Sequence, residues 1–229
     1  MSYNFLNKDW IVPPENPDYN IVNRIVGIKY KIPQHKIPTF FDLLERCRID
    51  ENRIYFNESQ NSEHSGIMFD FDIYQKTRKD QLIEPGILQG LVHSIVELLC
   101  KVIDFNKIDR ESIHVGIIRR PAVTMDDTKK CYKDGFHMLI PGIKISRVVK
   151  RFIIRKIIDS GVLEMAFADV EPADLTNSNG SKYDRKDFLD INSAHVPCFF
   201  VGCSSKPGKA PYVLRQIYKL DIKKPDSDK

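Results

Sequence analysis

The sequence has little of what marks several specialised protein classes. Its five cysteines are an odd number without a Cys-x-x-Cys pair, which excludes a disulfide scaffold and favours a reducing, intracellular compartment. Eleven glycines and 13 prolines in 229 residues are too few for a collagen-like or low-complexity chain. The start lacks the basic and apolar segments of a secretory signal. No apolar run approaches the roughly 18 residues that span a bilayer, so we expect no membrane partner.

The charge is nearly balanced, with 35 basic and 31 acidic residues and a net charge of +4. A sequence pI of about 8.7 permits an anionic partner without requiring one. The length is sufficient for one substantial domain. Any argument for nucleic-acid or phosphate binding therefore depends on local groups of residues.

Strand-like and helix-like segments alternate through the middle of the chain, and strands dominate the last third. A helix capped by Thr39 is predicted over 40–49, another begins at Pro85, and a third follows a Ser146 cap. Residues 125–135 read as a turn. The predicted strands are residues 21–32, 54–57, 66–74, 113–120, 136–145, 188–191, 198–206 and 212–220. This order predicts the α+β or α/β class, with a mixed sheet covered by helices.

Two aspartates in the segment GIMFDFDIY give the strongest chemical signal. Alternate residues of a strand share a face, so Asp70 and Asp72 should project together, with Phe69 and Phe71 on the opposite face. Neighbouring carboxylates repel each other, and a hard cation such as Mg²⁺ or Mn²⁺ between them removes that repulsion. The alternative is an exposed strand end where both acids face water.

A histidine and a lysine lie close together in the later segment KDGFHMLIP. His137 is either a hydrogen-bonded core residue or a group that binds metal or phosphate. Lys133, just before it, is either a phosphate ligand or a solvated turn residue.

A third acid follows a long polar loop, where Asp190 ends the apolar step Phe188-Leu189. Asp184 and Asp187 lie nearby, and chemistry alone does not choose among the three. Downstream, Lys206 stands in a Ser- and Gly-containing loop that suits phosphate oxygens, or that is a plain hairpin.

Two further groups of residues suggest a binding function, and each also has a purely structural explanation. In the helix 146–158, basic residues recur every three or four positions, with Val148, Phe152 and Ile153 expected to pack inward. Such a basic face either keeps a protein soluble or follows a nucleic-acid backbone. Its members are Arg147, Lys150, Arg151 and Arg155. His195, Cys198 and Cys203 also cluster in sequence, but we expect no zinc site there and a small buried residue at Cys198.

The order of these segments resembles the archaeo-eukaryotic primase superfamily. Its three motifs are D-x-D, a histidine-bearing strand and a final apolar-D step. Here FDFD comes first, KDGFH follows, and FLD comes last. The match covers roughly residues 60 to 215. It looks most like the N-terminal primase domain of poxvirus- and asfarvirus-type primase–helicases.

The resemblance implies a fold and an activity. The fold is one catalytic domain over 1–229, with an N-terminal α/β part (1–60) and a core related to the RNA-recognition fold (61–220). The activity is template-directed primer synthesis from NTPs or dNTPs on single-stranded DNA, during viral replication in the host cytoplasm or nucleus. A C-terminal helicase is the expected partner, so the chain is expected to be a fragment.

The resemblance also assigns roles to residues. Asp70, Asp72 and Asp190 would hold two divalent metal ions, Mg²⁺ or Mn²⁺. The incoming nucleotide would be bound by His137, Lys133 and Lys206. The proposed template contacts are Arg119, Arg120, Arg147, Lys150 and Arg151.

Two departures from the family pattern, and two rival functions, accompany this hypothesis. Gly135 stands where many relatives have Ser or Thr. The strand CFFVG lacks an Arg that relatives often carry, for which Arg119, Arg120 or Arg215 are possible substitutes. The rivals are a two-metal nuclease or D-x-D sugar transferase, and a non-catalytic module that binds single-stranded nucleic acid.

Overall fold

The structure, a computed structural model, divides into two compact units that are described separately. It describes residues 7–23, 25–49, 55–59, 63–77, 83–105, 113–128, 130–170, 184–195, 198–200 and 210–220. The first unit comprises Met1–Glu63 and Val196–Leu214, and the second comprises His64–His195 and Arg215–Lys229. Each unit is therefore built from two separate stretches of chain.

The first unit is a small antiparallel sheet with one α-helix. Its strands follow the order β1-β3-β2-β4-β9. Phe40 of the helix packs edge-on against Phe56 of β4, with ring centroids 6.0 Å apart, within a core that also contains Trp10 and Ile32. The elements are η1 (Lys8–Trp10), β1 (Ile11–Val12), β2 (Ile21–Asn23), β3 (Lys29–Tyr30), η2 (Gln34–Lys36), α1 (Ile37–Ile49), β4 (Phe56–Ser59) and β9 (Cys198–Phe200).

Two predictions for this unit are wrong in detail. Residues 21–32 form a hairpin of β2 and β3 instead of one strand, because Gly27 adopts a φ of +70° in the turn. Helix α1 begins at Ile37, so Thr39 lies inside it and is no cap. Pro38 in the first turn costs no hydrogen bond there, which lets the helix start earlier than the Thr signal indicates.

The second unit is a larger sheet with helices on one face. Its strands follow the order β10-β6-β8-β5, with β7 also paired to β8. The pairings of β5, β6 and β7 with β8 are all antiparallel. The elements are β5 (His64–Gln75), α2 (Pro85–Val102), β6 (His114–Arg119), β7 (Thr124–Asp126), β8 (Cys131–Ser146), α3 (Arg147–Asp159), α4 (Val162–Ala166), η6 (Arg185–Phe188), η7 (Ile191–His195) and β10 (Val213–Lys219).

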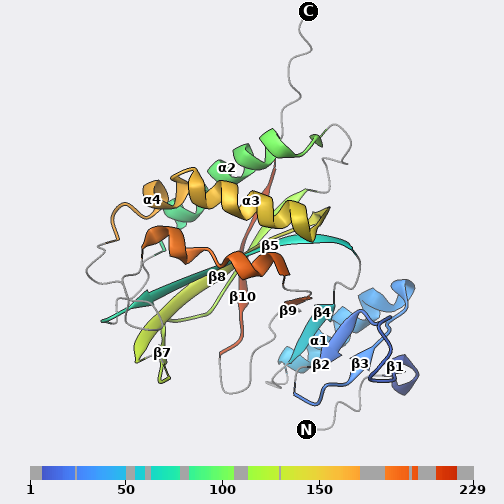
Figure 1. Ribbon diagram of the computed structural model, residues 1–229. Coiled ribbons are helices and arrows are strands. Elements are labelled where there is room, and N and C mark those ends of the chain that lie inside the picture. The colour runs from blue at the N-terminus through green and yellow to red at the C-terminus, as the bar shows by residue number, and fades with distance from the viewer. Residues whose placement is uncertain are drawn as a thin grey trace, which may run out of the picture. The chain divides into compact units, whose positions relative to one another are not determined.

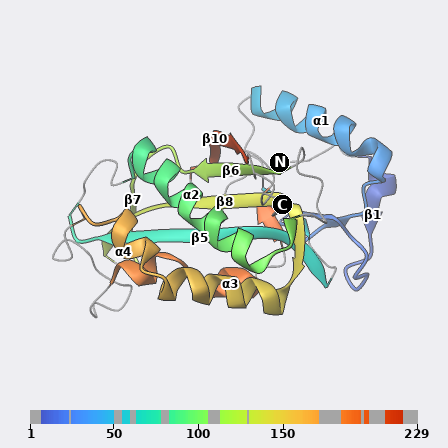
Figure 2. The same ribbon diagram turned by 90° about the horizontal axis from the view of Figure 1, so that it is seen from above.

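Helices α2 and α3 lie on the same side of this sheet, as Figures 1 and 2 show. Their apolar side chains pack with Phe69, Phe71 and Ile73 of β5 and with Phe136 of β8 in one large core. The rings of Phe71 and Phe136 stack with centroids 4.4 Å apart. The other side chains of β5 and β8, which include both aspartates, therefore project from the face away from the helices.

Helix α2 confirms the predicted start, with Pro85 at its first position. Its length of 18 residues and mean hydropathy of 1.2 also satisfy a membrane-span criterion by length and composition, which the sequence prediction missed. Five of its side chains nevertheless pack in the protein core: Leu88, Leu91, Val92, Ile95 and Leu99. Core helices of soluble proteins share these properties, so α2 is weak evidence for a membrane segment.

The α+β class is confirmed, and two segments differ from the prediction. Residues 131–135 belong to β8 instead of a turn, since Cys131 to Asp134 continue the pairing with β5 and β7. The FLDI segment is not a strand. It forms the end of η6, a single bridge from Leu189 to Phe71, and the start of η7.

Candidate active site

The D-x-D pair lies in the middle of β5, with both side chains on one face as predicted. The flanking Phe69 and Phe71 are fully buried on the helix side. The side chains of Asp70 and Asp72 are 25% and 20% exposed. The alternative of a solvated strand end is therefore wrong, because both acids stand in a mostly buried setting.

Each carboxylate of the pair has its own basic neighbour on β8. Oδ1 of Asp70 lies 3.2 Å from Nε2 of His137, and the two residues are directly paired in the strand register. Oδ2 of Asp72 accepts a hydrogen bond from Nζ of Lys133 at 2.5 Å. The ammonium of Lys133 offsets part of the repulsion between the two carboxylates, which the sequence argument expected a metal ion to remove.

Tyr74 adds a further contact that the sequence analysis missed. Its hydroxyl donates to Oδ2 of Asp72 at 3.1 Å, and Nζ of Lys133 lies 5.2 Å from the centroid of its ring. Burial, followed by the charge of Asp72, raises the pKa of the Tyr74 phenol well above its usual range. The signal was available, because residue 74 shares the face of residues 70 and 72 by the same two-residue period.

His137 is buried, at 2% exposure, but it faces the carboxylate of Asp70 and not an apolar surround. It is therefore a buried histidine beside Asp70, and its predicted role in binding metal or phosphate stays a prediction. Contact with a carboxylate fixes the orientation of the imidazole ring.

Gly135 explains why β8 comes so close to Asp72. A Cβ atom at this position would lie 2.4 Å from the carbonyl oxygen of Phe71 and 3.2 Å from Oδ1 of Asp72. The first distance is a clash with backbone. The departure from Ser or Thr at this position therefore fits the geometry of these two strands.

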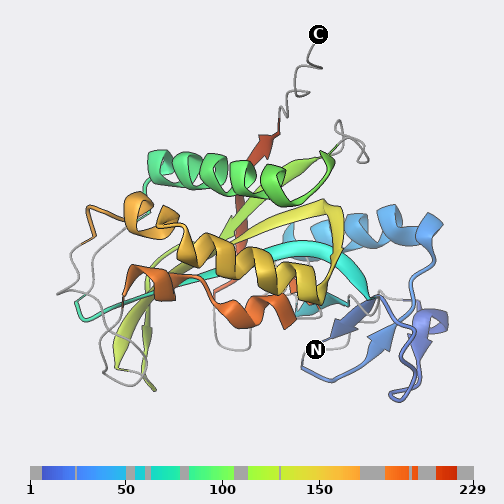
Figure 3. The same cartoon turned by 45° about the horizontal axis from the view of Figure 1, so that its top comes forward.

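Asp190 reaches the same part of the sheet from the distant 3₁₀ segment. Its backbone N–H donates to the carbonyl oxygen of Asp70 at 2.9 Å, directly after the bridge from Leu189 to Phe71. Figure 3 shows the orange segment beside β5. Oδ1 of the Asp190 side chain accepts from the N–H of Asn192 at 2.8 Å, which stabilises the local turn.

The two other candidate acids have local structural roles. Oδ1 of Asp184 accepts from the N–H of Arg185 at 2.7 Å, and the N–H of Asp184 donates to Asp187 at 2.9 Å. Together they form a capping box for η6. This favours Asp190 as the third acid of the site.

The donor chemistry of the three acids fits hard divalent cations, but the side chains are not already arranged as a metal site. Among the residues that the structure describes, no three Asp, Glu, His or Cys side chains are grouped closely enough to be ligands. Lys133 contacts Oδ2 of Asp72, and the N–H of Asn192 contacts Oδ1 of Asp190, so one oxygen of each carboxylate is engaged by a protein group. Carboxylate oxygens are the ligands that Mg²⁺ and Mn²⁺ prefer.

The two arginines at the end of β6 are held by protein groups. Nη2 and Nε of Arg119 donate to both oxygens of Asp134, at 2.6 and 3.3 Å, and Asp134 is 2% exposed. Nη1 of Arg120 donates to the hydroxyl of Thr124 at 3.1 Å. Sequence analysis missed Asp134 because its segment was read as a turn.

The predicted faces of helix α3 are partly wrong, although Ile153 is buried and the three arginines are exposed as expected. Val148 and Phe152 are exposed, at 79% and 48%, whereas Lys150 is 4% exposed. The outer surface of α3 is therefore an apolar groove bordered by basic side chains, lined by Arg147, Val148, Arg151, Phe152 and Arg155. It lies on the helix side of the sheet, away from the D-x-D face.

Lys150 instead binds inside the unit, where its ammonium donates to the hydroxyl of Ser65. Burial, with some repulsion from Arg147, lowers the pKa of Lys150 to about 8. The prediction that Lys150 shares an exposed basic face is wrong.

Some predicted residues lie outside the part of the chain that the structure describes. They are Lys206, Cys203, and the side chains of His195 and Cys198. The roles predicted for these residues stay predictions.

Comparison with known protein families identifies one family whose profile matches most of this chain. The sequence profile described as "C962R protein N-terminal AEP domain" matches residues 20–218. The chain therefore belongs to this family of archaeo-eukaryotic primase domains, which confirms the resemblance found in its motifs.

Curated relatives are similar over nearly the whole chain. Proteins named "Putative primase C962R" from African swine fever virus, in the Warthog/Namibia isolate and the Badajoz strain, are each 29% identical over 219 residues. The match covers 96% of this chain and 21% of each relative, so the chain spans about a fifth of their length.

Proposed function

We propose that this chain is the catalytic domain of a DNA-directed primase or primase-polymerase, a nucleotidyltransferase that works with Mg²⁺ or Mn²⁺. The observation that carries the proposal is the hydrogen bond from the N–H of Asp190 to the carbonyl of Asp70. It brings a third acid, more than a hundred positions away in the sequence, beside the D-x-D pair. The proposed setting is viral DNA replication in the host cytoplasm.

In the proposed reaction a 3′-hydroxyl oxygen attacks the α-phosphorus of a nucleoside triphosphate. The new P–O bond forms as the bond to the β-phosphate oxygen breaks, pyrophosphate leaves with the bonding electrons, and the hydroxyl proton passes to water. Bound divalent cations would supply Lewis-acid stabilisation of the phosphates and a more acidic hydroxyl. Asp70, Asp72 and Asp190 would hold them.

The basic neighbours of the acids have a second task in this proposal. Lys133 neutralises Asp72 before substrate arrives, and on its release from Asp72 its ammonium becomes available to the triphosphate. His137 is held beside Asp70, where its imidazole can contact a phosphate oxygen without much reorientation. Lys206 is proposed to contact the triphosphate on the resemblance alone.

The test is primer synthesis on single-stranded DNA with NTPs or dNTPs and Mg²⁺ or Mn²⁺. Replacing both acids, Asp70→Asn with Asp72→Asn, should lower synthesis by at least about 100-fold, the scale for losing a major electrostatic group at a reacting phosphate. Asp159→Asn, an exposed acid at the end of α3, is the matched control and should keep full activity. Equal synthesis by the double variant and the control would contradict the assignment.

One observation favours a second candidate, a non-catalytic module that binds single-stranded nucleic acid. Because the ammonium of Lys133 already contacts the carboxylate of Asp72, part of the negative charge on this face is offset when metal is absent. The module predicts DNA binding that is unchanged by EDTA, together with no synthesis. The primase predicts synthesis that stops when EDTA is added.

A further inference from the structure

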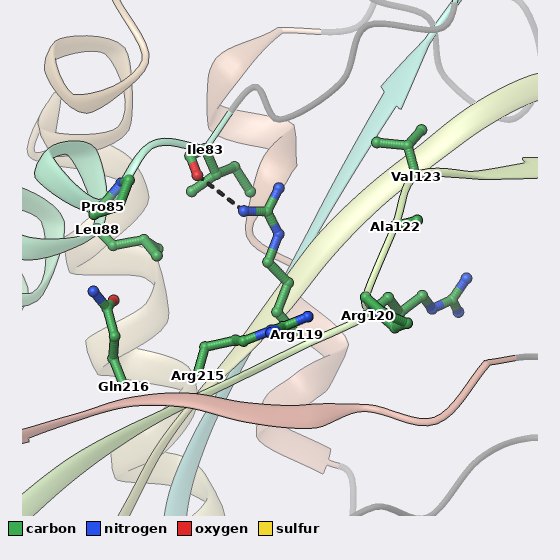
Figure 4. A pocket seen from close by; sticks show the side chains of 10 residues that line it. Ile83, Pro85, Leu88, Arg119, Arg120, Ala122, Val123, Arg215 and Gln216 are labelled. Atoms are coloured by element: carbon green, nitrogen blue, oxygen red, sulfur yellow. Dashed lines mark hydrogen bonds between the residues drawn. The ribbon is translucent and has the colours of Figure 1, made fainter.

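A cavity of about 510 Å³ opens at the end of β6, between the first turn of α2 and the edge strand β10 (Figure 4). Three arginines line it: Arg119, Arg120 and Arg215. None of the proposed catalytic residues is among its lining residues. Its volume lies within the range of small-molecule sites, about 300–1,000 Å³.

Arg119 is oriented in this pocket by protein contacts. Its guanidinium donates to both oxygens of the buried Asp134 and, through Nη1, to the carbonyl oxygen of Ile83 at 2.9 Å, the bond drawn in Figure 4. A guanidinium has five N–H groups, so two remain for a ligand. Asp134 balances the charge of Arg119 and leaves it as a fixed hydrogen-bond donor.

The other two arginines differ in how they meet the cavity. Arg120 is 8% exposed and is held by Thr124. Arg215 extends from β10 toward Arg119 in Figure 4. The described lining residues include no Asp or Glu. An anion in the cavity would therefore meet the charge of Arg215 beside the oriented guanidinium of Arg119.

The N-terminus of α2 adds to the positive potential on one side of the cavity. Pro85, the first residue of this 18-residue helix, lines the pocket, and the preceding Glu84 makes no side-chain cap. The partial positive charge at a helix N-terminus favours anions such as phosphate. Apolar side chains of Leu88 and Val123 complete the wall.

We propose that this pocket binds a nucleotide by its phosphate groups, at a site separate from the D-x-D face. Arg215 holds the phosphates, Arg119 supplies oriented donors, and the apolar wall contacts the nucleoside. Arginine forks match phosphate oxygens in pairs, which suits this role better than isolated lysines. The inference does not depend on primer synthesis.

The experiment measures binding of ADP, pyrophosphate and adenosine by calorimetry in EDTA, which removes cation-dependent binding at the three acids. ADP should bind, adenosine should not bind measurably, and pyrophosphate should bind at least threefold more weakly than ADP. Arg215→Gln should weaken ADP binding about tenfold, and Arg215→Lys less, because the charge remains while the fork is lost. Lys219→Gln, on the same strand, is the control and should leave the affinity unchanged.

The outcomes separate this site from the proposed active site. The double variant Asp70→Asn with Asp72→Asn should keep the ADP affinity of the wild type, whatever its effect on synthesis. Equal ADP affinity in Arg215→Gln and the wild type would overturn the proposal, as would absence of ADP binding. Pyrophosphate binding as tight as that of ADP would overturn the nucleoside contact.

Discussion

At Gly135 the backbone of β8 passes so close to β5 that a methyl group has no room. Gly135→Ala should lower the free energy of unfolding by about 1–3 kcal/mol, the range for overpacked positions, because the new Cβ would meet the carbonyl of Phe71. Gly90→Ala, in open space on α2, should instead stabilise by about 0.5–1 kcal/mol. Urea denaturation of both variants measures the difference, and equal effects would contradict the close approach.

Lys150 gives the protein a pH-dependent stability. Its pKa is lowered to about 8 in the folded protein from 10.5, so between these values the unfolded chain binds more protons. Stability from this group therefore rises with pH from about 8 to 10.5 and is lowest below pH 8. In Lys150→Met that rise should disappear, whereas Lys144→Met, at an exposed position, should keep it. Unfolding free energies across this pH range provide the measurement.

At the residue scale, sequence reasoning found the acids and missed their partners. The two-residue period of a strand was enough to put Asp70 and Asp72 on one face. It could not show that Lys133 and His137 contact them, because strand register across β5 and β8 depends on distant pairing. Asp134 was missed because residues 131–135 read as a turn, and its partner Arg119 comes from another strand.

At the scale of elements, helix α3 shows how one buried lysine can obscure the apolar spacing that identifies the core-facing side of a helix. Lys150, Ile153, Ile154 and Ile157 form the buried i, i+3, i+4, i+7 stripe. A lysine in that stripe made it look polar, and the apolar Val148 and Phe152 on the other side looked like core. By contrast, the Ser146 cap was predictable from local sequence, and its hydroxyl accepts from the N–H of Val149.

The exposed surface of α3 predicts a contact with single-stranded DNA. Arg147 and Arg151 are positioned to meet phosphates, while Phe152 offers a ring for base stacking. The double variant Arg147→Gln with Arg151→Gln should bind a labelled oligonucleotide more weakly. The slope of log affinity against log salt should also fall by roughly 1.4, about 0.7 per lost phosphate contact.

Fluorescence anisotropy at several salt concentrations measures both quantities. Lys101→Gln, an exposed basic residue at the end of α2, is the matched control and should change neither. An unchanged salt slope in the arginine variant would contradict the predicted contact between this surface and single-stranded DNA.

For the molecule as a whole, two separate apolar cores predict two regions of independent stability. Phe56→Ala removes a fully buried ring from the smaller core, at a cost of about 3–5 kcal/mol. Hydrogen exchange should then speed up in β2 and β4 more than in β5 and β8. Phe167→Ala, in the larger core, should show the reverse pattern. Equal changes in both sheets would mean that the units unfold together.

The class of fold was predictable from the alternation of strands and helices, but the assignment of segments to sheets was not. Strand β9 pairs with β4, about 140 positions earlier. The local composition of a strand does not indicate which distant strand it pairs with. The hairpin in residues 21–32 was missed because its turn depends on the positive φ of a single residue, Gly27. Non-local pairing and single turn residues account for most of the differences.

The bond from the N–H of Asp190 to the carbonyl of Asp70, with the Leu189–Phe71 bridge, affects more than the acids it joins. It occupies backbone positions on the outer edge of β5, where another chain would otherwise be able to add a strand. In the described sheet, part of the β5 edge is therefore covered. The other edge strand is β10, on which Leu214 and Ile217 are exposed. Growth of this sheet by intermolecular strand addition is thereby directed to β10, so the segment that delivers the third acid also protects that side from self-association.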